Sequence, residues 1–257
     1  MIDAIVIPMA GEGKRFQDEG YTIPKPLIEV DSEPMIIRVM EDLPTSKKQV
    51  FITRKEHNEN FGLHEKLKSK FPNSIQISLD YTTDGQATTC NLGLETIGDE
   101  ESILIAPCDN GMKYDEKKFF QLTQDKETTA IIWTFRGNAT VKRNPKMYGW
   151  VKTNSDIATN VSCKVPISDT PINDHAIIGT FWFRHAKDYR EAYKSMIQKN
   201  RRVNNEFYVD ELMNEVIDAK KKVRVFEIDT YVGFGTPNDL RTYMYWKKFF
   251  KEDYNLK

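Results

Sequence analysis

The order of apolar runs along the chain limits the fold more than any other feature. Short runs typical of buried strands alternate with segments whose apolar residues recur at helical spacing. Such alternation favours an open, mostly parallel sheet with helices on both faces. The expected strands cover residues 4–7, 50–53, 75–79, 102–106, 130–135, 150–153, 176–183 and 223–228. The expected helices cover residues 35–43, 59–71, 88–97, 116–124, 186–199, 209–219 and 237–250.

The second part of the chain differs from the first in its balance of elements. From about residue 111 onward, strands become more frequent relative to helices, which predicts mixed strand directions there. No internal repeat or long Gly/Ser linker interrupts the 257 residues. We therefore predict an α/β fold, a Rossmann-like three-layer sandwich with a mostly parallel, mixed sheet, in a single domain over residues 1–257.

The charge balance excludes several classes of partner. The net charge is −1, with 37 Lys and Arg against 38 Asp and Glu. A near-neutral chain lacks the general basic surface that binds nucleic acid or anionic membranes, so we expect neither partner. No run of 18 apolar residues occurs, and the N-terminus enters a strand without a basic leader, so we expect neither a membrane span nor a signal peptide. Three widely spaced cysteines match neither a zinc site nor a disulfide framework, which fits a reducing cytoplasm.

A glycine-bearing loop follows the first expected strand. It reads Ala10-Gly11-Glu12-Gly13-Lys14-Arg15, and Lys25 follows between Pro24 and Pro26. Glycines allow backbone N–H groups to turn toward one point, and the two prolines restrict the backbone that carries the lysine. Converging amides and cations at the end of a strand predict an anion site, most simply for a polyphosphate. A tight turn and an ordinary surface lysine are the alternatives.

Two common phosphate-binding patterns do not fit this loop. The third glycine of the dinucleotide fingerprint would fall at Phe16. A Walker A loop would need Ser or Thr after Gly13-Lys14, where the chain has Arg15.

A carboxylate follows another expected strand at the same edge of the sheet. Asp109 comes after strand 102–106, and ligands of open α/β sheets bind beyond the carboxyl ends of the strands. A carboxylate in this place suits a hard cation that bridges phosphates. The turn-forming sequence Asp109-Asn110-Gly111 is an alternative explanation.

The glycine loop and the lysine together resemble a known family. Gly11-x-Gly13-x-Arg15 followed by Pro24-Lys25-Pro26-Leu27 is similar to the signature of the sugar-phosphate nucleotidyltransferases, also called nucleotidylyltransferases or pyrophosphorylases. Cytidylyltransferases of small phosphorylated alcohols are neighbours of that family. The resemblance extends to about residue 240 and implies the nucleotide-diphospho-sugar transferase type of fold. It implies a nucleotide-binding half over about residues 1–110, an acceptor-binding half over about 111–240 and a C-terminal helix over 237–257.

The resemblance also implies an activity and a role for each residue that matches a motif. The reaction would use Mg²⁺, join a nucleoside triphosphate to a phosphorylated acceptor and release pyrophosphate. Its product would be a precursor for the synthesis of surface polysaccharide. Arg15 and Lys25 would be catalytic, and Asp109 would hold the metal. The implied nucleotide-binding residues are Ala10, Gly11, Glu12, Gly13, Lys14, Gly85, Gln86 and Asp109. The implied acceptor-binding residues are Gly149, Lys164, Gly179 and Glu206.

Several of these matches leave alternatives open. Gly85 and Gln86 also read as the start of a helix, and Glu206 as part of a helix entry. Cys163 and Val165 depart from the family pattern around Lys164. Lys164 could instead be a solvated lysine at the edge of a strand. Glycine within a strand, as at 179, can also mark a bulge.

The clearest departure from the family lies near the C-terminus. Val232-Gly233-Phe234-Gly235-Thr236-Pro237 matches the family's x-Asp-x-Gly-Thr-Pro, but Gly233 stands where many members carry a second metal-binding aspartate. Either water and phosphates complete the Mg²⁺ shell, or Asp229 or Asp210 substitutes.

Other interpretations of the activity, of two arginines and of the last helix remain open at this point. A glycosyltransferase with a related sheet and a non-catalytic nucleotide-binding module are rivals of the enzyme, and a cytidylyltransferase of a small non-sugar phosphate is a variant of it. Arg201 and Arg202 could bind a second anion of the acceptor or form a solvated helix end. The aromatic C-terminal helix predicts either core packing or a homodimer contact.

Overall fold

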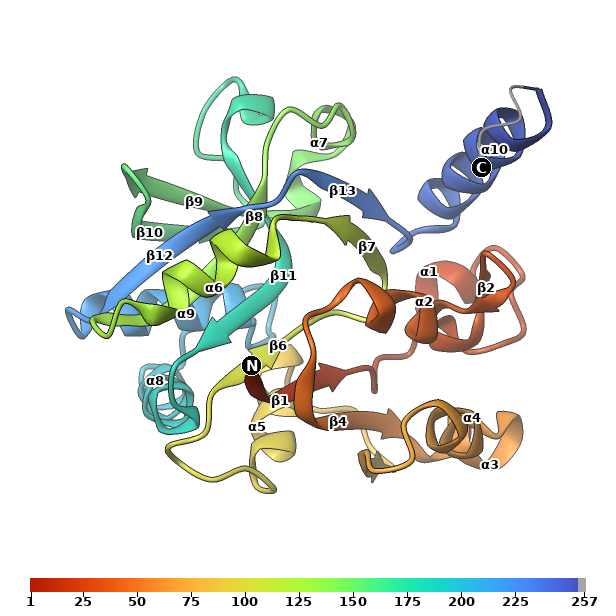
Figure 1. Ribbon diagram of the computed structural model, residues 1–257, viewed down its shortest axis with the longest axis horizontal. Helices are drawn as coiled ribbons and strands as arrows, with labels where there is room; N and C mark the ends of the chain where they lie inside the picture. Colours follow the sequence, from red (N-terminus) through yellow and green to blue (C-terminus); the bar gives the residue numbers. More distant parts are fainter. Residues whose placement is uncertain (254–257) are drawn as a thin grey trace.

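The computed structural model describes residues 1–253, and within this range the main element is a nine-stranded sheet (Figure 1). Its strands are β1 (Ile2–Pro8), β4 (Ser46–Arg54), β5 (Ile75–Leu79), β6 (Ile103–Ile105), β8 (Thr128–Phe135), β9 (Gly149–Asn154), β10 (Ile157–Cys163), β11 (His175–Phe183) and β12 (Lys222–Glu227). They lie in the order β5-β4-β1-β6-β11-β8-β12-β10-β9, and β9 also pairs with β11.

Most strands of this sheet run in one direction. Strands β4, β5 and β6 are parallel to β1 or to its neighbour, and β12 is parallel to β8. Strand β11 is antiparallel to both β6 and β8, and β10 is antiparallel to β12 and β9. The reversals lie in the second half of the chain, so the prediction of a mostly parallel, mixed α/β sheet is confirmed.

Two small ribbons stand outside the main sheet. Strand β7 (Asn110–Lys113) pairs antiparallel with β13 (Thr230–Gly233), and β2 (Glu29–Val30) pairs with β3 (Glu33–Pro34). None of these short strands is predicted by the apolar pattern. The β7–β13 ribbon joins segments far apart in the sequence, and no local pattern announces such a pairing.

Helices cover both faces of the sheet. They are α1 (Lys14–Gln17), α2 (Met35–Asp42), α3 (Lys55–Phe61), α4 (Leu63–Lys70), α5 (Gln86–Leu94), α6 (Glu116–Gln124), α7 (Thr140–Arg143), α8 (Ala186–Gln198), α9 (Val209–Asp218) and α10 (Pro237–Asp253). Short 3-10 turns are η1 (Lys25–Leu27), η2 (Pro145–Met147) and η3 (Pro171–Asn173). The single helix expected over 59–71 is wrong, because Gly62 adopts φ 64 and separates α3 from α4.

The three layers follow from the alternation of side chains along the strands. On β1, Ala4 and Val6 pack into a core with residues of α5, α8 and α9. Ile5 and Ile7 point to the opposite face and pack with residues of α2, α4 and α6. Successive side chains of a strand point to opposite faces, so apolar residues at consecutive positions require helices on both sides.

Helix α10 begins in a small core and then leaves it. Leu240 is buried with Phe16 and Phe234, whereas Trp246 is 49% exposed and Phe250 44%. Figure 1 shows α10 extending beyond the other helices. Core packing is therefore correct for Leu240 and wrong for the outer aromatic residues. Residues 254–257 of the expected helix lie outside the described residues.

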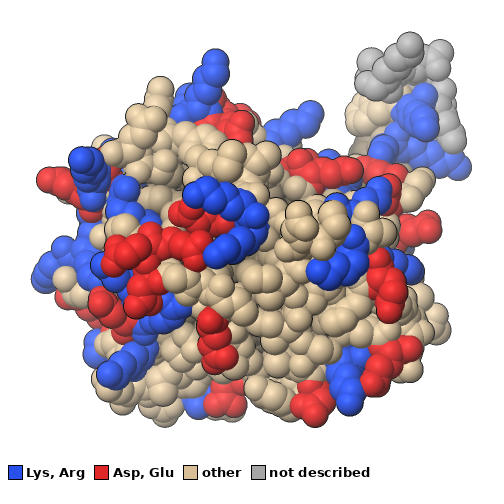
Figure 2. Space-filling model, turned by 60° about the horizontal axis from the view of Figure 1, so that its bottom comes forward, with Lys and Arg blue, Asp and Glu red and all other residues tan. Residues whose placement is uncertain are grey.

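Charged side chains of both signs lie on the surface (Figure 2), and the cysteines lie inside the protein. On the face shown in Figure 2, acidic side chains lie among the basic ones. None of the helices within the described residues is long and apolar enough to cross a membrane. Cys90, Cys108 and Cys163 are free and buried.

Candidate active site

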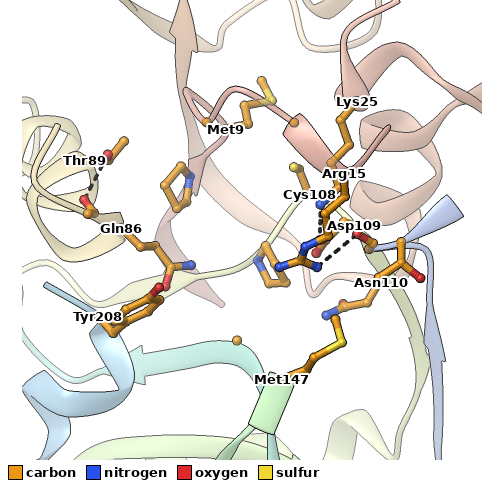
Figure 3. A pocket seen from close by; sticks show the side chains of 18 of the residues that line it. Met9, Arg15, Lys25, Gln86, Thr89, Cys108, Asp109, Asn110, Met147 and Tyr208 are labelled. Atoms are coloured by element: carbon orange, nitrogen blue, oxygen red, sulfur yellow. Dashed lines mark hydrogen bonds and ion pairs between the residues drawn. The ribbon is translucent and has the colours of Figure 1, made fainter. Parts of the chain in front are cut away.

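A cleft of about 680 Å³ opens where β1 and β6 end. The loop after β1, residues 82–89 and residues 107–110 line one side, and residues of β9, β11 and the start of α9 line the other. All the predicted site residues lie on its wall: Ala10, Gly11, Glu12, Gly13, Lys14, Arg15, Lys25, Gly85, Gln86, Asp109, Gly149, Lys164, Gly179 and Glu206. Figure 3 shows Arg15, Lys25 and Asp109 together at one end of this cleft, with Gln86 and Tyr208 at the other.

The glycine loop turns sharply before α1. Gly13 has φ +70, and a Cβ there would lie 3.4 Å from the Cβ of Lys25. A side chain at 13 would therefore be strained by the left-handed backbone and would lie in contact with the lysine. Apart from its chain neighbours, no described residue would come within 4 Å of a Cβ at Gly11, so this part of the loop faces open space.

Lys25 is held rigidly and points at a carboxylate. Pro24 and Pro26 are both buried, so the backbone on either side of the lysine is fixed. The Nζ of Lys25 forms an ion pair with Oδ2 of Asp109. Burial lowers the pKa of Lys25, but the Asp109 carboxylate raises it by more, so the net pKa lies above its usual value. Lys25 is therefore held in its charged form.

The β7–β13 ribbon places Asp109. The N–H of Phe234 donates to the carbonyl oxygen of Asp109 at 2.8 Å, next to the ribbon. A Cβ at Gly235 would come within 2.9 Å of Asp109 Oδ2, so only glycine leaves room for the carboxylate. Arg15 Nη1 donates to the carbonyl oxygen of Gly235 at 3.4 Å. The ribbon thus joins Arg15, Asp109 and the Gly-Thr-Pro segment.

At this end of the cleft, Asp109 suits a metal ion that would be held mainly by the phosphates of a nucleotide. The backbone of Gly233 pairs with Asn110, and a Cβ at 233 would lie 3.1 Å from the hydroxyl of Tyr231. Asp229 does not line the cleft, and Asp210 lines its far end. Among the described residues, no group of three or more His, Cys, Asp or Glu could hold a metal. Mg²⁺ commonly uses one or two carboxylates with phosphates and water, so Asp109 alone fits such an ion.

Gly85 joins the two sides of the cleft. It has φ +128, and a Cβ there would lie 2.6 Å from both the N and the O of Phe207. The N–H of Phe207 donates to Asp84 O at 2.8 Å, and the N–H of Ala87 donates to Phe207 O at 2.9 Å. Helix α5 begins at Gln86 rather than at the predicted 88. The glycine is therefore required by this close backbone approach.

The two arginines upstream of Glu206 make contacts within the protein. Arg202 donates to Asp84 at 2.9 Å and lies 4.0 Å from the ring centroid of Phe207. Arg201 pairs with Glu215 and Asp218, each at 3.1 Å. Neither arginine lines the cleft. Their interpretation as a second anion site is therefore not supported.

The predicted acceptor residues meet at the other end. Lys164 adopts φ 60, and its N–H donates to Tyr148 O at 3.0 Å. Its ammonium lies 4.8 Å from the ring centroid of Tyr208. Gly179 has φ +84, and a Cβ there would contact the ring of Pro107 at 3.4 Å. Glu206 lies near Tyr208, whose pKa is raised by burial and by this carboxylate.

The cleft also contains residues that the sequence did not single out as ligands. They include Asn110, Tyr148, Tyr208, Tyr231 and Asp239, and Asp210 is present too, although the sequence offered it only as a substitute metal ligand. Tyr208 and Asp210 belong to the same short motif as Glu206, which was the available signal for them. Tyr231 stacks on Phe135, with ring centroids 4.2 Å apart, and no sequence pattern marks it.

Comparison with known proteins assigns a family to this cleft. The sequence model of the family named "Nucleotidyl transferase" matches residues 4–241. The chain belongs to the nucleotidyl transferase family. As an enzyme of this family it is a nucleotidyltransferase, which sets aside the glycosyltransferase and the non-catalytic module. No curated protein matches the sequence closely enough to count as a relative.

Solved structures of similar fold cover almost the whole nucleotidyl transferase chain. The nucleoside-diphosphate-sugar pyrophosphorylase from Vibrio cholerae RC9 has 22% identity and a TM-score of 0.76, covering 94% of this chain and 99% of that one. A putative glucose-1-phosphate thymidylyltransferase from Bacillus anthracis has 16% identity and a TM-score of 0.71, with 94% and 93% covered. The inositol-1-phosphate CTP transferase from T. maritima has 16% identity and a TM-score of 0.72, with 98% and 97% covered. These likenesses establish the nucleotide-diphospho-sugar transferase type of fold.

Proposed function

We propose that the cleft joins a nucleoside triphosphate to a small phosphorylated acceptor, such as a sugar phosphate, and releases pyrophosphate. The observation that carries this proposal is the cluster of Arg15, Lys25 and Asp109 beside the glycine loop. This cluster suits a triphosphate because it combines cations with a carboxylate that can share a metal. The other end of the cleft offers one ammonium and two carboxylates, which suit a phosphate that carries polar groups.

The reaction needs positioning more than proton transfer. An oxygen of the acceptor phosphate attacks the α-phosphorus, the bond from this phosphorus to the bridging oxygen breaks, and pyrophosphate leaves. The attacking oxygen is already an anion, so no general base is needed. Lys25 donates to the α-phosphate oxygens, and Arg15 with the loop amides holds the β- and γ-phosphates.

A divalent metal completes the charge balance. Asp109 would hold Mg²⁺ together with the phosphates, and the ion would supply positive charge to the oxygens of the nucleotide. Lys25 is paired with Asp109, so a nucleotide that binds here would compete with the carboxylate for this ammonium.

The division into halves and the remaining residue roles belong to the same proposal. Residues 1–110 bind the nucleotide, with Gly85 and Gln86 near the base, and residues 111–240 bind the acceptor through Gly149, Lys164, Gly179 and Glu206. A cytidylyltransferase of a small non-sugar phosphate is the second candidate. It is supported by the similar fold of the T. maritima protein, which is described as an inositol-1-phosphate CTP transferase.

A substrate panel tests the proposed reaction. CTP, dTTP, UTP and GTP would each be combined with glucose 1-phosphate or inositol 1-phosphate and Mg²⁺, and pyrophosphate would be measured. We expect release that depends on both substrates and stops when the metal is chelated. Binding of nucleotide without pyrophosphate from any pair would contradict the proposal.

The cellular setting and the oligomeric state belong to the proposal too. Surface-polysaccharide precursor synthesis in the cytoplasm fits the activity, and a homodimer fits the exposed Tyr245, Trp246 and Phe250 of α10. Light scattering on the purified protein tests the dimer, and a monomeric mass at micromolar concentration would contradict it.

A further inference from the structure

Strand β7 follows Asp109 directly, so the position of this strand decides where that carboxylate lies. Within residues 1–253, β7 pairs with β13 alone, so its other edge has no strand beside it. On that edge the N–H of Met112 donates to Oδ2 of Asp42 at 2.9 Å. A side chain at the end of α2 thus provides the acceptor that a neighbouring strand would otherwise provide.

Asp42 stands at an unfavourable place for a carboxylate. It is the last residue of α2, where negative charge opposes the helix macrodipole, and its side chain is only 17% exposed. Such a carboxylate is stable only when donors surround it. Arg38, one turn earlier, donates to Oδ1 at 2.8 Å, and the N–H of Met112 donates to Oδ2. Each carboxylate oxygen therefore has a donor, and one of the two donors belongs to β7.

Gly111 lets this carboxylate reach the strand. A Cβ at 111 would lie 3.0 Å from Oδ2 of Asp42 and 3.3 Å from Cζ of Phe234. The backbone at 111 does not need glycine, because its φ is not among the positive ones. The missing side chain therefore makes room for the carboxylate and the ring. The N–H of the same Phe234 donates to the carbonyl oxygen of Asp109, so both contacts bear on the segment that carries the metal-binding carboxylate.

A residue can position another only if it is held in place itself. Arg38 connects Asp42 to a second carboxylate, because its Nε lies 3.5 Å from Oδ2 of Asp31. Asp31 accepts from the hydroxyl of Tyr243 at 2.6 Å and pairs with Lys247, and both partners belong to α10. The end of α2 is thus fixed between α10 and β7.

We infer that Asp42 is a positioning residue for the divalent metal, because it holds β7 and thereby fixes the Asp109 carboxylate. This inference rests on the proposed function, which assigns the metal to Asp109. Asp42 does not line the cleft, so it acts only through the backbone of β7. Partners that orient a metal ligand commonly contribute about 10–100-fold to metal affinity. Loss of Asp42 should therefore weaken metal binding and leave the contacts of the nucleotide intact.

The test compares Asp42→Ala and Asp42→Asn, with Glu41→Ala as the matched control. Asparagine keeps an oxygen that can accept from Met112, whereas alanine leaves that N–H without its acceptor. Glu41 is the neighbour of Asp42 on α2 and also faces Arg38, at 3.9 Å, but its side chain is 58% exposed. The control therefore removes a carboxylate from α2 without releasing β7.

The first measurement is the affinity for Mn²⁺, read by electron paramagnetic resonance with a bound α,β-methylene analogue of a nucleoside triphosphate. Of the analogues of CTP, dTTP, UTP and GTP, the one that wild type binds most tightly is used. We expect Asp42→Ala to raise the Kd of Mn²⁺ about tenfold, Asp42→Asn at most about threefold, and Glu41→Ala not at all. Gly111→Ala crowds the same contact from the strand and should raise this Kd too. With EDTA in place of the metal, all these proteins should bind the analogue equally.

Two further measurements separate positioning from a general loss of stability. Pyrophosphate release by Asp42→Ala should recover toward the wild-type rate as Mg²⁺ is raised, whereas a partly unfolded protein stays impaired at every Mg²⁺ concentration. Hydrogen exchange at the Met112 amide should be faster in Asp42→Ala than in wild type, and this increase should exceed any increase in β1.

Four results would overturn the inference. They are a Kd of Mn²⁺ in Asp42→Ala within about twofold of wild type, an equal rise in Glu41→Ala, a rise in Asp42→Asn as large as in Asp42→Ala, and an impairment that Mg²⁺ does not reduce. If wild type bound the analogue and Mn²⁺ but released no pyrophosphate from any pair of substrates, the proposed function would fail instead. The Mn²⁺ affinities would then still decide on Asp42.

Discussion

Replacing Lys25 by methionine tests the phosphate end of the cleft. The substitution keeps most of the apolar stem and removes the ammonium that faces Asp109. Loss of one preorganised donor to a developing charge costs about 2.7–4 kcal/mol, so kcat should fall by ~100–1000-fold. The side chains of Lys25 and Asp109 are only 19% and 26% exposed, so leaving Asp109 without its cation should lower the free energy of unfolding by about 1–3 kcal/mol. The expected fall in kcat is therefore larger than any fall in activity that unfolding of the variant would cause.

The assay is steady-state pyrophosphate release with saturating substrates, alongside urea unfolding of both proteins. Lys113→Met is the control, since Lys113 is an exposed lysine on β7 and does not line the cleft. We expect this control to match wild type. A kcat for Lys25→Met within about threefold of wild type would refute the role of the ammonium.

Three other perturbations follow from close approaches and charge. Gly235→Ala places a Cβ 2.9 Å from Asp109 Oδ2, so kcat should fall at least ~10-fold with a higher Mg²⁺ requirement, and an unchanged metal titration would contradict this. Gly85→Ala forces an alanine to φ +128 against Phe207, so urea unfolding should show a loss of about 1–3 kcal/mol, whereas wild-type stability would contradict the close approach. Burial raises the pKa of Asp210 to about 6, so between about pH 4 and pH 6 the folded state binds a proton more readily than the unfolded state. The free energy of unfolding should therefore fall by up to about 3 kcal/mol as the pH rises through this window. Asp210→Asn should flatten that part of the curve, and identical pH profiles would count against a shifted Asp210.

The sequence brings residues of the nucleotide side of the cleft together because they follow strands. Lys25 and Asp109 are far apart in the chain, but both lie beyond the carboxyl ends of parallel strands, which meet at one edge. The position of the glycine loop could be predicted because an apolar strand precedes it. Such residues can be placed without knowing any tertiary contact.

Other features depend on contacts that no local pattern contains. The β7–β13 ribbon pairs Asn110–Lys113 with Thr230–Gly233, and the two strands have weak apolar patterns of their own. Asp210 reads as an ordinary acidic residue at a helix start until Gly149 is seen to lie against it. The aromatic residues of α10 resemble a core helix in sequence, whereas the folded chain leaves Trp246 half exposed.

A structure of the protein with a non-hydrolysable nucleoside triphosphate and Mg²⁺ tests the central claim most directly. The quantity to measure is the distance from Lys25 Nζ to the nearest α-phosphate oxygen. We expect a hydrogen bond of about 2.7–3.2 Å, with the glycine loop against the β- and γ-phosphates and the metal on Asp109. A bound nucleotide whose α-phosphate lies far from Lys25, with the lysine still paired to Asp109 or turned to solvent, would contradict the account.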